Sequence, residues 1–321
     1  LPQTRVTFWD HVSELFASSF ADTIGAWCEK NNLLFTGHLM WEPTLHTQVI
    51  GVGEAMRSYR SFGLPGIDML GNGYEYMTAK QAQSASHQFG RVGVLSEMYG
   101  VTSWSFDFRG HKLQGDWQAA LGITTRVHHL SLLSLLGEAK RDYPASFNVH
   151  VPWYKEYPYV EDHYARLNTV LTRGKARVRV GVIHPIESMW LNWGPTGLSQ
   201  EAQDRLDAQF KNVTEWLLFG NVDFDFICES LLPRLCEKGD NPLPVGSVAY
   251  EAVIIPGSDT IRSSTLERLE AFCLSGGTLI FMGDVPAYVD GAPSNRAKAL
   301  AEAQGKMIPF ERLDLMKAVE P

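Results

Sequence analysis

Carboxyl side chains follow two strand-length apolar segments in the first half of the chain. Glu97 comes after the apolar residues of Val92–Leu95, and Glu42 comes after Met40 and Trp41, just past another apolar run. A carboxyl group at such a place can act as a nucleophile or a base, or as a general acid when an apolar neighbour such as Trp41 raises its pKa. The same positions also suit a residue that forms a salt bridge or lies in water, so position alone leaves both interpretations open.

Imidazole, carboxylate and indole side chains near the same strand ends could contact a hydroxylated ligand. A neutral imidazole exchanges hydrogen bonds with hydroxyl groups, a carboxylate accepts them, and an indole packs on the apolar face of a sugar. Each type has a structural alternative, because strand histidines and tryptophans often serve the core and Asp68 suits a turn. His38, His128 and His129 lie near one rim, which favours at least one ligand contact. The predicted binding residues are His38, Trp41, Asp68, Trp104, His128 and Trp153.

Motifs for other chemistries are weak or missing in the sequence. His38 and Glu42 are four residues apart, but a strand end lies between them, so they do not share one helical face as zinc ligands at this spacing do. The four cysteines form no CxxC pair, which argues against a zinc knuckle and a disulfide framework. The sequence also has no GxSxG elbow and no phosphate-binding P-loop.

Alternating helix and strand signals in residues 1–150 predict parallel βα units. Helices are expected over 8–30, 53–62, 78–89 and 112–121, and strands over 33–39, 66–70, 91–97 and 123–128. Polar residues at the carboxyl ends of parallel strands are the way in which a (β/α)8 barrel presents its active site. About four units fit before residue 150. We therefore expect the C-terminal part of a barrel, with the N-terminal part upstream in a longer chain or in another subunit.

The strand and helix pattern restarts after an aromatic linker and a helix in residues 151–175. Strands are expected over 176–184, 222–228, 251–256 and 278–282, and helices over 199–219 and 263–274. Buried strands alternating with helices predict a flavodoxin-like doubly wound domain over 176–321. The predicted fold is therefore α/β, with the C-terminal part of a (β/α)8 TIM barrel followed by this second domain.

Length and composition limit the classes of partner. The 321 residues suffice for two domains, and the net charge of −8 offers no basic stripe for nucleic acid. The apolar runs are shorter than the roughly 18–20 residues of a membrane helix, so no membrane partner is expected. The chain starts with neither an initiator Met nor a signal peptide, so we expect a piece of a longer protein or a processed product. The protein is expected to be soluble, and its compartment stays open between secreted and cytoplasmic.

Connected phrases in the first half resemble a known group of enzymes. They are Gly37–Pro43 (GHLMWEP), Pro65–Asp68 (PGID), Val94–Glu97 (VLSE), Asp116–Gln118 (DWQ), Lys140–Pro144 (KRDYP) and His184–Ser188 (HPIES). Over about residues 5–195 the chain resembles large glycoside hydrolases of the family 106 α-L-rhamnosidase-like group. Residues 176–321 resemble the glutamine-amidotransferase-like domain that follows the barrel in family 42 β-galactosidases, where it assists trimer assembly.

This resemblance implies a glycoside hydrolase that cleaves a carbohydrate with paired carboxylates. Glu97 would be the nucleophile or base and Glu42 the candidate acid, while an acid on an upstream fourth strand is a rival for Glu42. Carboxyl groups about 5–5.5 Å apart would mean retention, and about 6.5–9.5 Å inversion. The sequence requires no cofactor, whereas the resemblance allows Ca2+ near the sugar. The assembly role of the second domain also allows a homo-oligomer.

A second hypothesis is left open by the truncated barrel. The chain could be a non-catalytic carbohydrate-binding or assembly fragment of a glycosidase scaffold. In the amidotransferase-like segment, Cys228 follows a strand without a glycine on either side, and no histidine follows His184. A glutaminase needs its cysteine on a tight elbow together with a histidine base. We therefore expect this domain to be non-catalytic.

Overall fold

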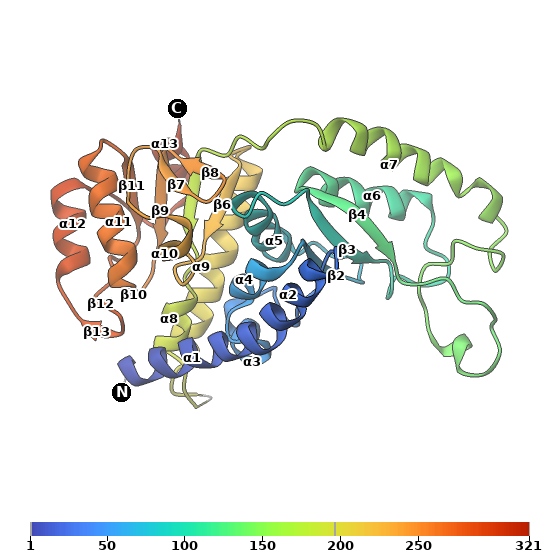
Figure 1. The fold of residues 1–321 in the computed structure, drawn as a ribbon, viewed down its shortest axis with the longest axis horizontal. Coiled ribbons are helices and arrows are strands. Elements are labelled where there is room, and N and C mark those ends of the chain that lie inside the picture. The colour runs from blue at the N-terminus through green and yellow to red at the C-terminus, as the bar shows by residue number, and fades with distance from the viewer. Residues whose placement is uncertain (1, 196, 321) are drawn as a thin grey trace.

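The first half of the chain is built around a parallel sheet (Figure 1). The computed structural model describes residues 2–195 and 197–320, so Leu1, Thr196 and Pro321 of the predicted segments 1–150 and 176–321 lie outside the described residues. The strands, in sheet order, are β1 (Thr36–Gly37), β2 (Leu64–Met69), β3 (Val94–Met98) and β4 (Ile123–His128). Neighbours in this sheet are also neighbours along the chain, which is the arrangement of successive βα units.

Both outer strands of this sheet have an open edge. In residues 2–195 and 197–320, β1 pairs only with β2, and β4 pairs only with β3. Leu33 and Leu34, which precede β1, are 54% and 67% exposed. The predicted strand over 33–39 is therefore wrong in extent and shrinks to Thr36–Gly37, because its first apolar residues face water instead of a neighbouring strand.

Helices pack against β2, β3 and β4, and further helices lie around these strands. The N-terminal helical segment runs through α1 (Pro2–Phe16), the π-helical turn η1 (Ala17–Asp22) and α2 (Thr23–Lys30). The others are α3 (Leu45–Gly51), α4 (Ala55–Ser58), η2 (Tyr59–Ser61), α5 (Tyr76–Gln88), α6 (Phe108–Ala120), η3 (Gly137–Arg141), η4 (Tyr154–Glu156) and α7 (Pro158–Leu171). Asp107 caps α6 by accepting hydrogen bonds from the N–H groups of Arg109 and Gly110, so this helix begins ahead of the predicted residue 112.

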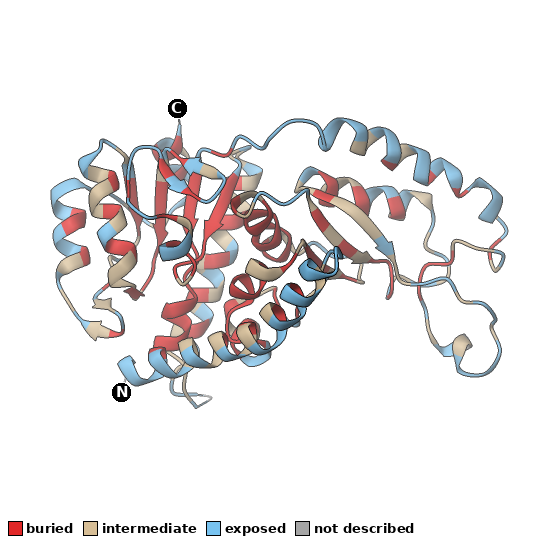
Figure 2. Ribbon diagram, viewed as in Figure 1, coloured by how far each residue is buried: buried red, intermediate tan, exposed pale blue. Residues whose placement is uncertain are grey.

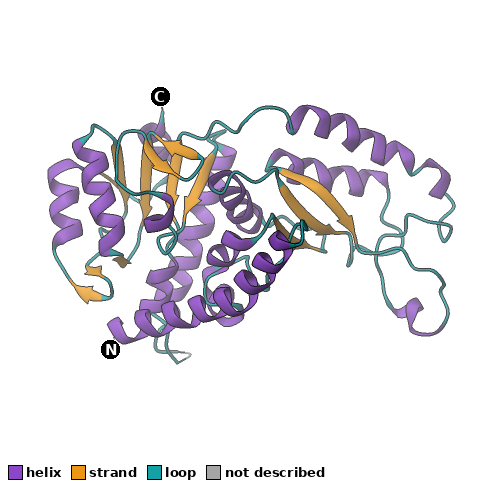
Figure 3. Ribbon diagram, in the orientation of Figure 1, coloured by secondary structure: helices purple, strands orange, loops and turns teal. Residues whose placement is uncertain are grey.

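The second half contains another parallel sheet, with the order β14-β11-β9-β5-β6. Its strands are β5 (Val180–Ile183), β6 (Phe224–Ile227), β9 (Ala252–Pro256), β11 (Thr278–Met282) and β14 (Lys306–Ile308). Numbered along the chain from one to five, these strands lie in the order 2-1-3-4-5, one of the common orders of doubly wound sheets. The α/β class with parallel sheets is thus confirmed (Figure 3).

Helices cover both faces of the second sheet. Val182 and Ile254 enter the core under α9, whereas their neighbours Ile183 and Ile255 enter the core under α11, as the alternation of strand side chains requires. The helices are α8 (Ile186–Leu191), α9 (Gln200–Phe219), α10 (Leu232–Leu235), α11 (Ser263–Leu274), α12 (Arg296–Gln304) and α13 (Arg312–Val319). Short strands are β7 (Leu243–Val245), β8 (Val248–Tyr250), β10 (Thr260–Ile261), β12 (Tyr288–Val289) and β13 (Ala292–Pro293). In the part of the chain that the structure describes, no helix is long and apolar enough to cross a bilayer.

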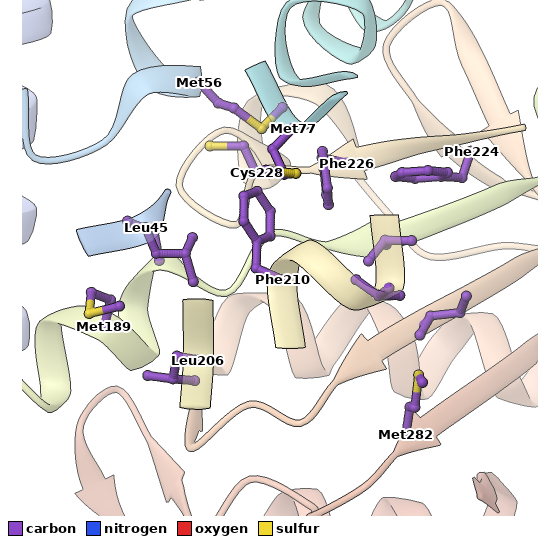
Figure 4. Close-up of a cluster of buried hydrophobic side chains, with 14 of the residues drawn as sticks. Leu45, Met56, Met77, Met189, Leu206, Phe210, Phe224, Phe226, Cys228 and Met282 are labelled. Atoms are coloured by element: carbon purple, nitrogen blue, oxygen red, sulfur yellow. The ribbon is translucent and has the colours of Figure 1, made fainter. Parts of the chain in front are cut away.

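The two halves share a hydrophobic core. Leu45, Met56 and Met77, from α3, α4 and α5, belong to the same cluster of buried side chains as Phe210 and Phe226 of the second half (Figure 4). Buried residues continue from the second sheet into α5 (Figure 2). The segments on either side of the predicted linker are therefore packed together.

Candidate functional site

Glu97 lies near the carboxyl end of β3, among polar side chains from neighbouring strands. The register of the sheet pairs Asp68 of β2 with Glu97, so both side chains leave the same face. His38 directly follows β1, and its Nε2 lies 3.0 Å from Glu97 Oε2. His129 directly follows β4, and its Nδ1 lies 2.9 Å from Glu97 Oε1. An imidazole therefore holds each carboxylate oxygen of Glu97.

Two more carboxylates flank these imidazoles. Asp68 Oδ2 lies 4.0 Å from His38 Nδ1, and Asp142 Oδ2 lies 3.9 Å from His129 Nε2. We call the line of Asp68, His38, Glu97, His129 and Asp142 the carboxylate–imidazole chain. Its side chains are between 27% and 41% exposed, so a ligand can reach them from solvent.

The contacts of His38 determine its protonation. Nδ1 lies 2.9 Å from the carbonyl oxygen of Leu39, which only accepts hydrogen bonds, so Nδ1 carries a hydrogen. The contact of Nε2 with the carboxylate of Glu97 needs a second hydrogen for the same reason. Burial alone would lower the pKa of His38, but the Leu39 carbonyl and the nearby carboxylates outweigh burial and raise this pKa. Below its raised pKa, His38 is an imidazolium that contacts the carboxyl group of Glu97.

Glu42 is the buried acid beside this line of groups. It is 3% exposed, and its Oε1 accepts a hydrogen bond of 3.0 Å from the N–H of Leu39. Burial raises the pKa of Glu42 to about 7, although backbone hydrogen bonds and His38 oppose the rise. The Glu42 carbonyl oxygen accepts from Gln48 Nε2 of α3 at 3.0 Å and from Gln81 Nε2 of α5 at 3.1 Å. Near neutral pH this carboxyl group can therefore carry a proton to donate.

The predicted tryptophans lie in different surroundings. Trp41 is 49% exposed, so its indole can face a ligand, while helices α3 and α5 contact the neighbouring Glu42. The Trp104 indole N–H donates a hydrogen bond of 2.9 Å to the carbonyl oxygen of Asp142, which joins it to one end of the carboxylate–imidazole chain. Trp153 is half-buried, and no contact within the described ranges brings it to Glu97 or Glu42.

His128 lies on the other side of the sheet from Glu97. The register pairs His128 with the buried Met98, and strand side chains alternate between faces, so His128 points towards the helices. Its Nε2 lies 2.7 Å from the Tyr157 hydroxyl oxygen. Burial lowers the pKa of His128 to about 3, so the ring is neutral. The structure therefore does not bring this predicted binding residue to the site.

His129 and Asp142 complete the site, although neither is among the predicted binding residues. The alternation along β4 could have identified His129, because one of two adjacent histidines after a strand must turn to the face opposite the other. Asp142 comes from the long loop after β4, where no periodic signal marks an inward side chain. Its place depends on contacts of that loop, such as the hydrogen bond from Trp104.

The donor set around Glu97 does not fit calcium. Ca2+ takes about six to eight oxygen ligands, whereas both Glu97 oxygens face imidazole nitrogens. Among the described residues, no group of three or more His, Cys, Asp or Glu side chains is placed to hold a metal ion.

Cys228, at the carboxyl end of the second sheet, is buried together with its hydrogen-bond partner Glu54. Cys228 follows β6, and its Sγ donates to Glu54 Oε1 at 2.6 Å. Burial and the adjacent Glu54 carboxylate raise the pKa of this thiol well above its ordinary value. Glu54 Oε2 also accepts from Arg57 Nε at 2.7 Å, and both residues are enclosed. The Cys228 thiol is thus a buried hydrogen-bond donor and lacks the character of a nucleophile.

Comparison with known proteins relates the chain to glycoside hydrolases at low identity. No family model matches the sequence. A protein of Formosa agariphila named "Putative beta-glucuronidase" is 26% identical over 287 residues, which cover 86% of this chain and 22% of that protein. The chain is a distant homologue of this protein and spans about a fifth of its length.

Solved structures of larger glycosidases share the fold. A rhamnosidase from Novosphingobium sp. PP1Y superposes with a TM-score of 0.61 at 17% identity, over 96% of this chain and 30% of that chain. A GH42 β-galactosidase from G. stearothermophilus superposes with a TM-score of 0.64 at 12% identity, over 92% of this chain and 43% of that chain. The β-galactosidase of Halorubrum lacusprofundi gives a TM-score of 0.63 at 12% identity, over 94% of this chain and 46% of that chain.

Proposed function

We propose that this chain forms the C-terminal part of the (β/α)8 barrel of a glycoside hydrolase, followed by a flavodoxin-like domain. The sequential strand order of the first sheet and its polar strand ends support the barrel. The open edges of β1 and β4 and the exposed Leu33 and Leu34 are surfaces that further barrel strands would cover. The order 2-1-3-4-5 supports the second domain. The partial coverage of larger glycosidases supports a barrel that is completed by sequence beyond these residues.

The observation that carries the hydrolase proposal is Glu97 held between two imidazoles. His38 and His129 each place a ring nitrogen within hydrogen-bond distance of one oxygen of Glu97 and so orient its carboxyl group. An ionised carboxylate at the mouth of a barrel suits the nucleophile or the base of a glycosidase. Glu42 has the complementary property, because its burial favours the protonated form that a general acid needs.

The proposed reaction uses the two carboxyl groups in opposite charge states. Glu42 gives its proton to the glycosidic oxygen, the bond from this oxygen to the anomeric carbon breaks, and the leaving group departs as an alcohol. Glu97 either attacks the anomeric carbon or takes a proton from the water molecule that attacks it. Where Glu97 attacks, a water molecule that gives a proton to Glu42 then breaks the bond between Glu97 and the sugar and frees both carboxyl groups. In both courses the positive charge of the oxocarbenium-like transition state develops next to the Glu97 carboxylate, which stabilises it.

The charges of the site favour a neutral sugar. Asp68, Glu97 and Asp142 all present carboxylates, and the positive charge of His38 is already paired with Glu97. A uronic acid would bring a further negative charge against these groups. We therefore favour a neutral hydroxylated sugar, such as an α-L-rhamnoside, whose hydroxyl groups would donate to Asp68 and Asp142 while Trp104 packs nearby.

One observation favours a second function. The protein borders the carboxylate–imidazole chain on one side, because the outer edges of β1 and β4 are open within the described residues. Without strands on those edges, the chain would serve as a carbohydrate-binding or assembly module and would not cleave its ligand. Saccharide binding without hydrolysis by the longest available form of the protein would favour this second function.

Hydrolysis of a panel of aryl glycosides tests the proposal. The panel contains α-L-rhamnoside, β-D-galactoside and β-D-glucuronide, and the enzyme is the longest available form with its Glu97→Gln variant. We expect one glycoside to be cleaved and Glu97→Gln to lower its kcat/KM by at least about a thousandfold. Glu138→Gln is the matched control, because Glu138 is 79% exposed on η3, and it should keep full activity. Full activity of Glu97→Gln, or no cleavage by the folded full-length protein, would contradict the proposal.

A further inference from the structure

One glutamine connects the buried acid of the site to the second half of the chain. Gln81 of α5 is fully buried. Its Nε2 donates to the carbonyl oxygens of Glu42 and Met77, each at 3.1 Å. Its Oε1 lies 3.0 Å from Nε2 of His184, which follows β5 of the second sheet. A continuous line of hydrogen bonds therefore leads from His184 to the backbone of Glu42.

The acceptors at one end of this line determine the direction of each hydrogen bond. The carbonyl oxygens of Glu42 and Met77 only accept, so the Gln81 atom that faces them is the amide nitrogen. The side-chain atom of Gln81 that faces His184 is then the amide oxygen, which accepts a hydrogen bond. Nε2 of His184 must therefore carry the ring hydrogen that it donates to this oxygen. Burial lowers the pKa of His184 to about 4, so the ring keeps this neutral form at neutral pH. His184 Nδ1 has no hydrogen-bond partner among the described residues, so Nε2–H is the contact that orients the ring.

The core of the second half holds the His184 ring in place. The ring meets Phe210 of α9 and Phe226 of β6 edge to face, with centroid distances of 5.3 and 5.7 Å and interplanar angles of 86° and 85°. The backbone N–H of His184 donates to the carbonyl oxygen of Ile227 at 2.9 Å. Both phenylalanines belong to the core that the two halves share (Figure 4). The imidazole therefore cannot turn unless this packed core rearranges.

We propose that His184 is a positioning residue for Glu42 and acts through Gln81, so that the second domain holds the general acid of the barrel site in place. The inference rests on the role of Glu42 in the proposed function. It also gives a role to the phrase His184–Ser188, which the barrel site itself does not use. The second domain would thus contribute to catalysis, in addition to any part that it has in assembly.

Removal of the imidazole would disturb the turn that carries Glu42. Without His184 the oxygen of Gln81 is buried with no donor, and the amide is free to turn away from the Glu42 carbonyl. The backbone there is constrained, since Trp41 has a left-handed conformation with φ of 64° and the Leu39 N–H donates to Glu42 Oε1. A looser turn admits water to the Glu42 carboxyl, which faces the charges of His38 and Asp68 and the hydroxyl group of Tyr59.

Hydrogen–deuterium exchange of the full-length protein tests the linkage between His184 and Glu42 and does not require a measurement of activity. We expect the peptide over residues 38–44 to exchange at least about tenfold faster in His184→Leu, while the β4 peptide over 123–128 keeps its wild-type rate. His184→Gln should restore slow exchange, because the Gln amide can donate to Gln81 in place of the imidazole. His111→Leu is the matched control, because His111 is also fully buried but has no contact with Glu42 or Gln81 among the described residues.

The pH dependence of hydrolysis provides a second measurement. The rate falls at high pH as the general acid loses its proton, so we expect this alkaline limb to move to lower pH by about one unit in His184→Leu. The rate at pH 7 then falls about fivefold, and His184→Gln restores it. If His184→Leu does not fold, Gln81→Met with its equally buried control Gln118→Met takes its place.

Each outcome decides between the positioning role and the catalytic role. Unchanged exchange over 38–44 in a folded His184→Leu or Gln81→Met protein overturns the positioning role, even if hydrolysis persists. Equal acceleration of exchange in the His111→Leu and Gln118→Met controls overturns it as well. Faster exchange in a full-length protein that cleaves no glycoside supports the linkage and overturns the catalytic role of Glu42.

Discussion

The carboxyl ends of the two parallel sheets carry acidic side chains in opposite surroundings. At the first sheet, Glu97 and Asp68 are 27% and 36% exposed, and their charged neighbours are imidazoles. At the second sheet, Glu187 and Glu229 are each 1% exposed. There Arg262 donates to Glu187 Oε1 through Nε at 2.7 Å and to Glu229 Oε2 through its backbone N–H at 2.8 Å. The carboxyl groups at the first end are open to a ligand, whereas Glu187 and Glu229 at the second end, which we call the closed end, are buried by the protein itself.

The difference shows that a polar strand end is not by itself a reactive site. The guanidinium of Arg57 contacts Glu54, Asp10 and Glu14, so it has little hydrogen-bonding capacity left for a ligand. Asp10 of α1 also joins Arg57 to Arg262 and so spans the closed end. In the described part of the chain, no arginine or lysine forms an ion pair with Glu97, and its two oxygens contact imidazoles alone. Its carboxyl group therefore lacks the guanidinium partners that Glu54 and Glu187 have.

Removal of an arginine from the closed end should have the largest effect on stability. Arg57→Leu leaves Glu54 enclosed without its nearest guanidinium and removes one of the arginine partners of Asp10 and of Glu14. Breaking a buried ion pair by removing one partner costs about 3–5 kcal/mol, so we expect the free energy of unfolding to fall by about this amount. Urea denaturation followed by circular dichroism measures the change. Arg141→Leu, which removes an exposed pair on η3, is the control and should leave the midpoint unchanged.

The closed end should also make stability fall as the pH rises. Burial raises the pKa of Glu187 to about 7 and that of Glu229 to about 8. A carboxyl group whose pKa is higher in the folded state binds more protons when folded, so its stabilising effect is lost as the pH rises through the folded pKa. His128 and His184, whose pKa values are lowered, act in the opposite direction only below the unfolded value near 6.5. Between pH 6.5 and 8 we therefore expect the free energy of unfolding to fall, and Glu42 and His38 of the first half, whose pKa values are also raised, act in the same direction.

A neutral isostere at Glu229 sharpens this pH prediction. Glu229→Gln keeps the shape of the protonated carboxyl group, so the fall in stability between pH 6.5 and 8 should become clearly shallower. Urea midpoints at several pH values measure the slope. Glu251→Gln, at an exposed pair with Arg179, is the control and should keep the wild-type slope. Equal slopes in Glu229→Gln and the wild type would contradict the raised pKa at the closed end.

His128, the last residue of β4, and His129, which follows it, should affect stability and activity separately. His128→Phe leaves the Tyr157 hydroxyl without its partner, so we expect the free energy of unfolding to fall by about 1–3 kcal/mol with little change in kcat. His129→Gln should lower kcat by about tenfold to a hundredfold, because Glu97 Oε1 loses its aligned donor, with little change in stability. Paired unfolding and rate measurements on both variants test this separation. Similar losses of both properties in the two variants would contradict it.

The smallest effect on stability is expected at the open end. Glu97→Gln removes a charge that is 27% exposed, so the free energy of unfolding should change by less than about 1 kcal/mol while hydrolysis is lost. The same urea titration measures it against Arg57→Leu. A loss as large as that of Arg57→Leu would mean that Glu97 serves the fold, and the contrast between the two ends would disappear.

Local patterns in the sequence account for most of the helices and for the open end of the first sheet. The helix predicted over 199–219 is α9 (Gln200–Phe219), because its apolar spacing is a local property. His38 and Glu97 meet because parallel strands bring their carboxyl ends to one edge of a sheet. The true extent of the strand over 33–39 could not be predicted in this way, since it depends on neighbours of Leu33 and Leu34.

Contacts between distant segments account for what the sequence did not show. Asp142 reaches the site through a loop, and the pairing of Gln81 with His184 joins residues that are 103 positions apart. No periodic pattern encodes such a pair. For His128 and His129, the alternation along β4 shows that the two side chains turn to opposite faces, but the register with β3 decides that His128 lies on the face opposite Glu97.

The shared core affects the order in which the two halves of the chain fold. Gln88 of α5 donates to the carbonyl oxygen of Phe226, and Ser84 accepts from the N–H of the same residue, across 138 and 142 positions of sequence. On a ribosome, the half that carries Glu97 emerges first but cannot bury Met56 and Met77 until β6 has been synthesised. Such long-range closure slows folding and leaves apolar surface exposed in the meantime. The part of the chain that is translated first is therefore the part that finishes folding late.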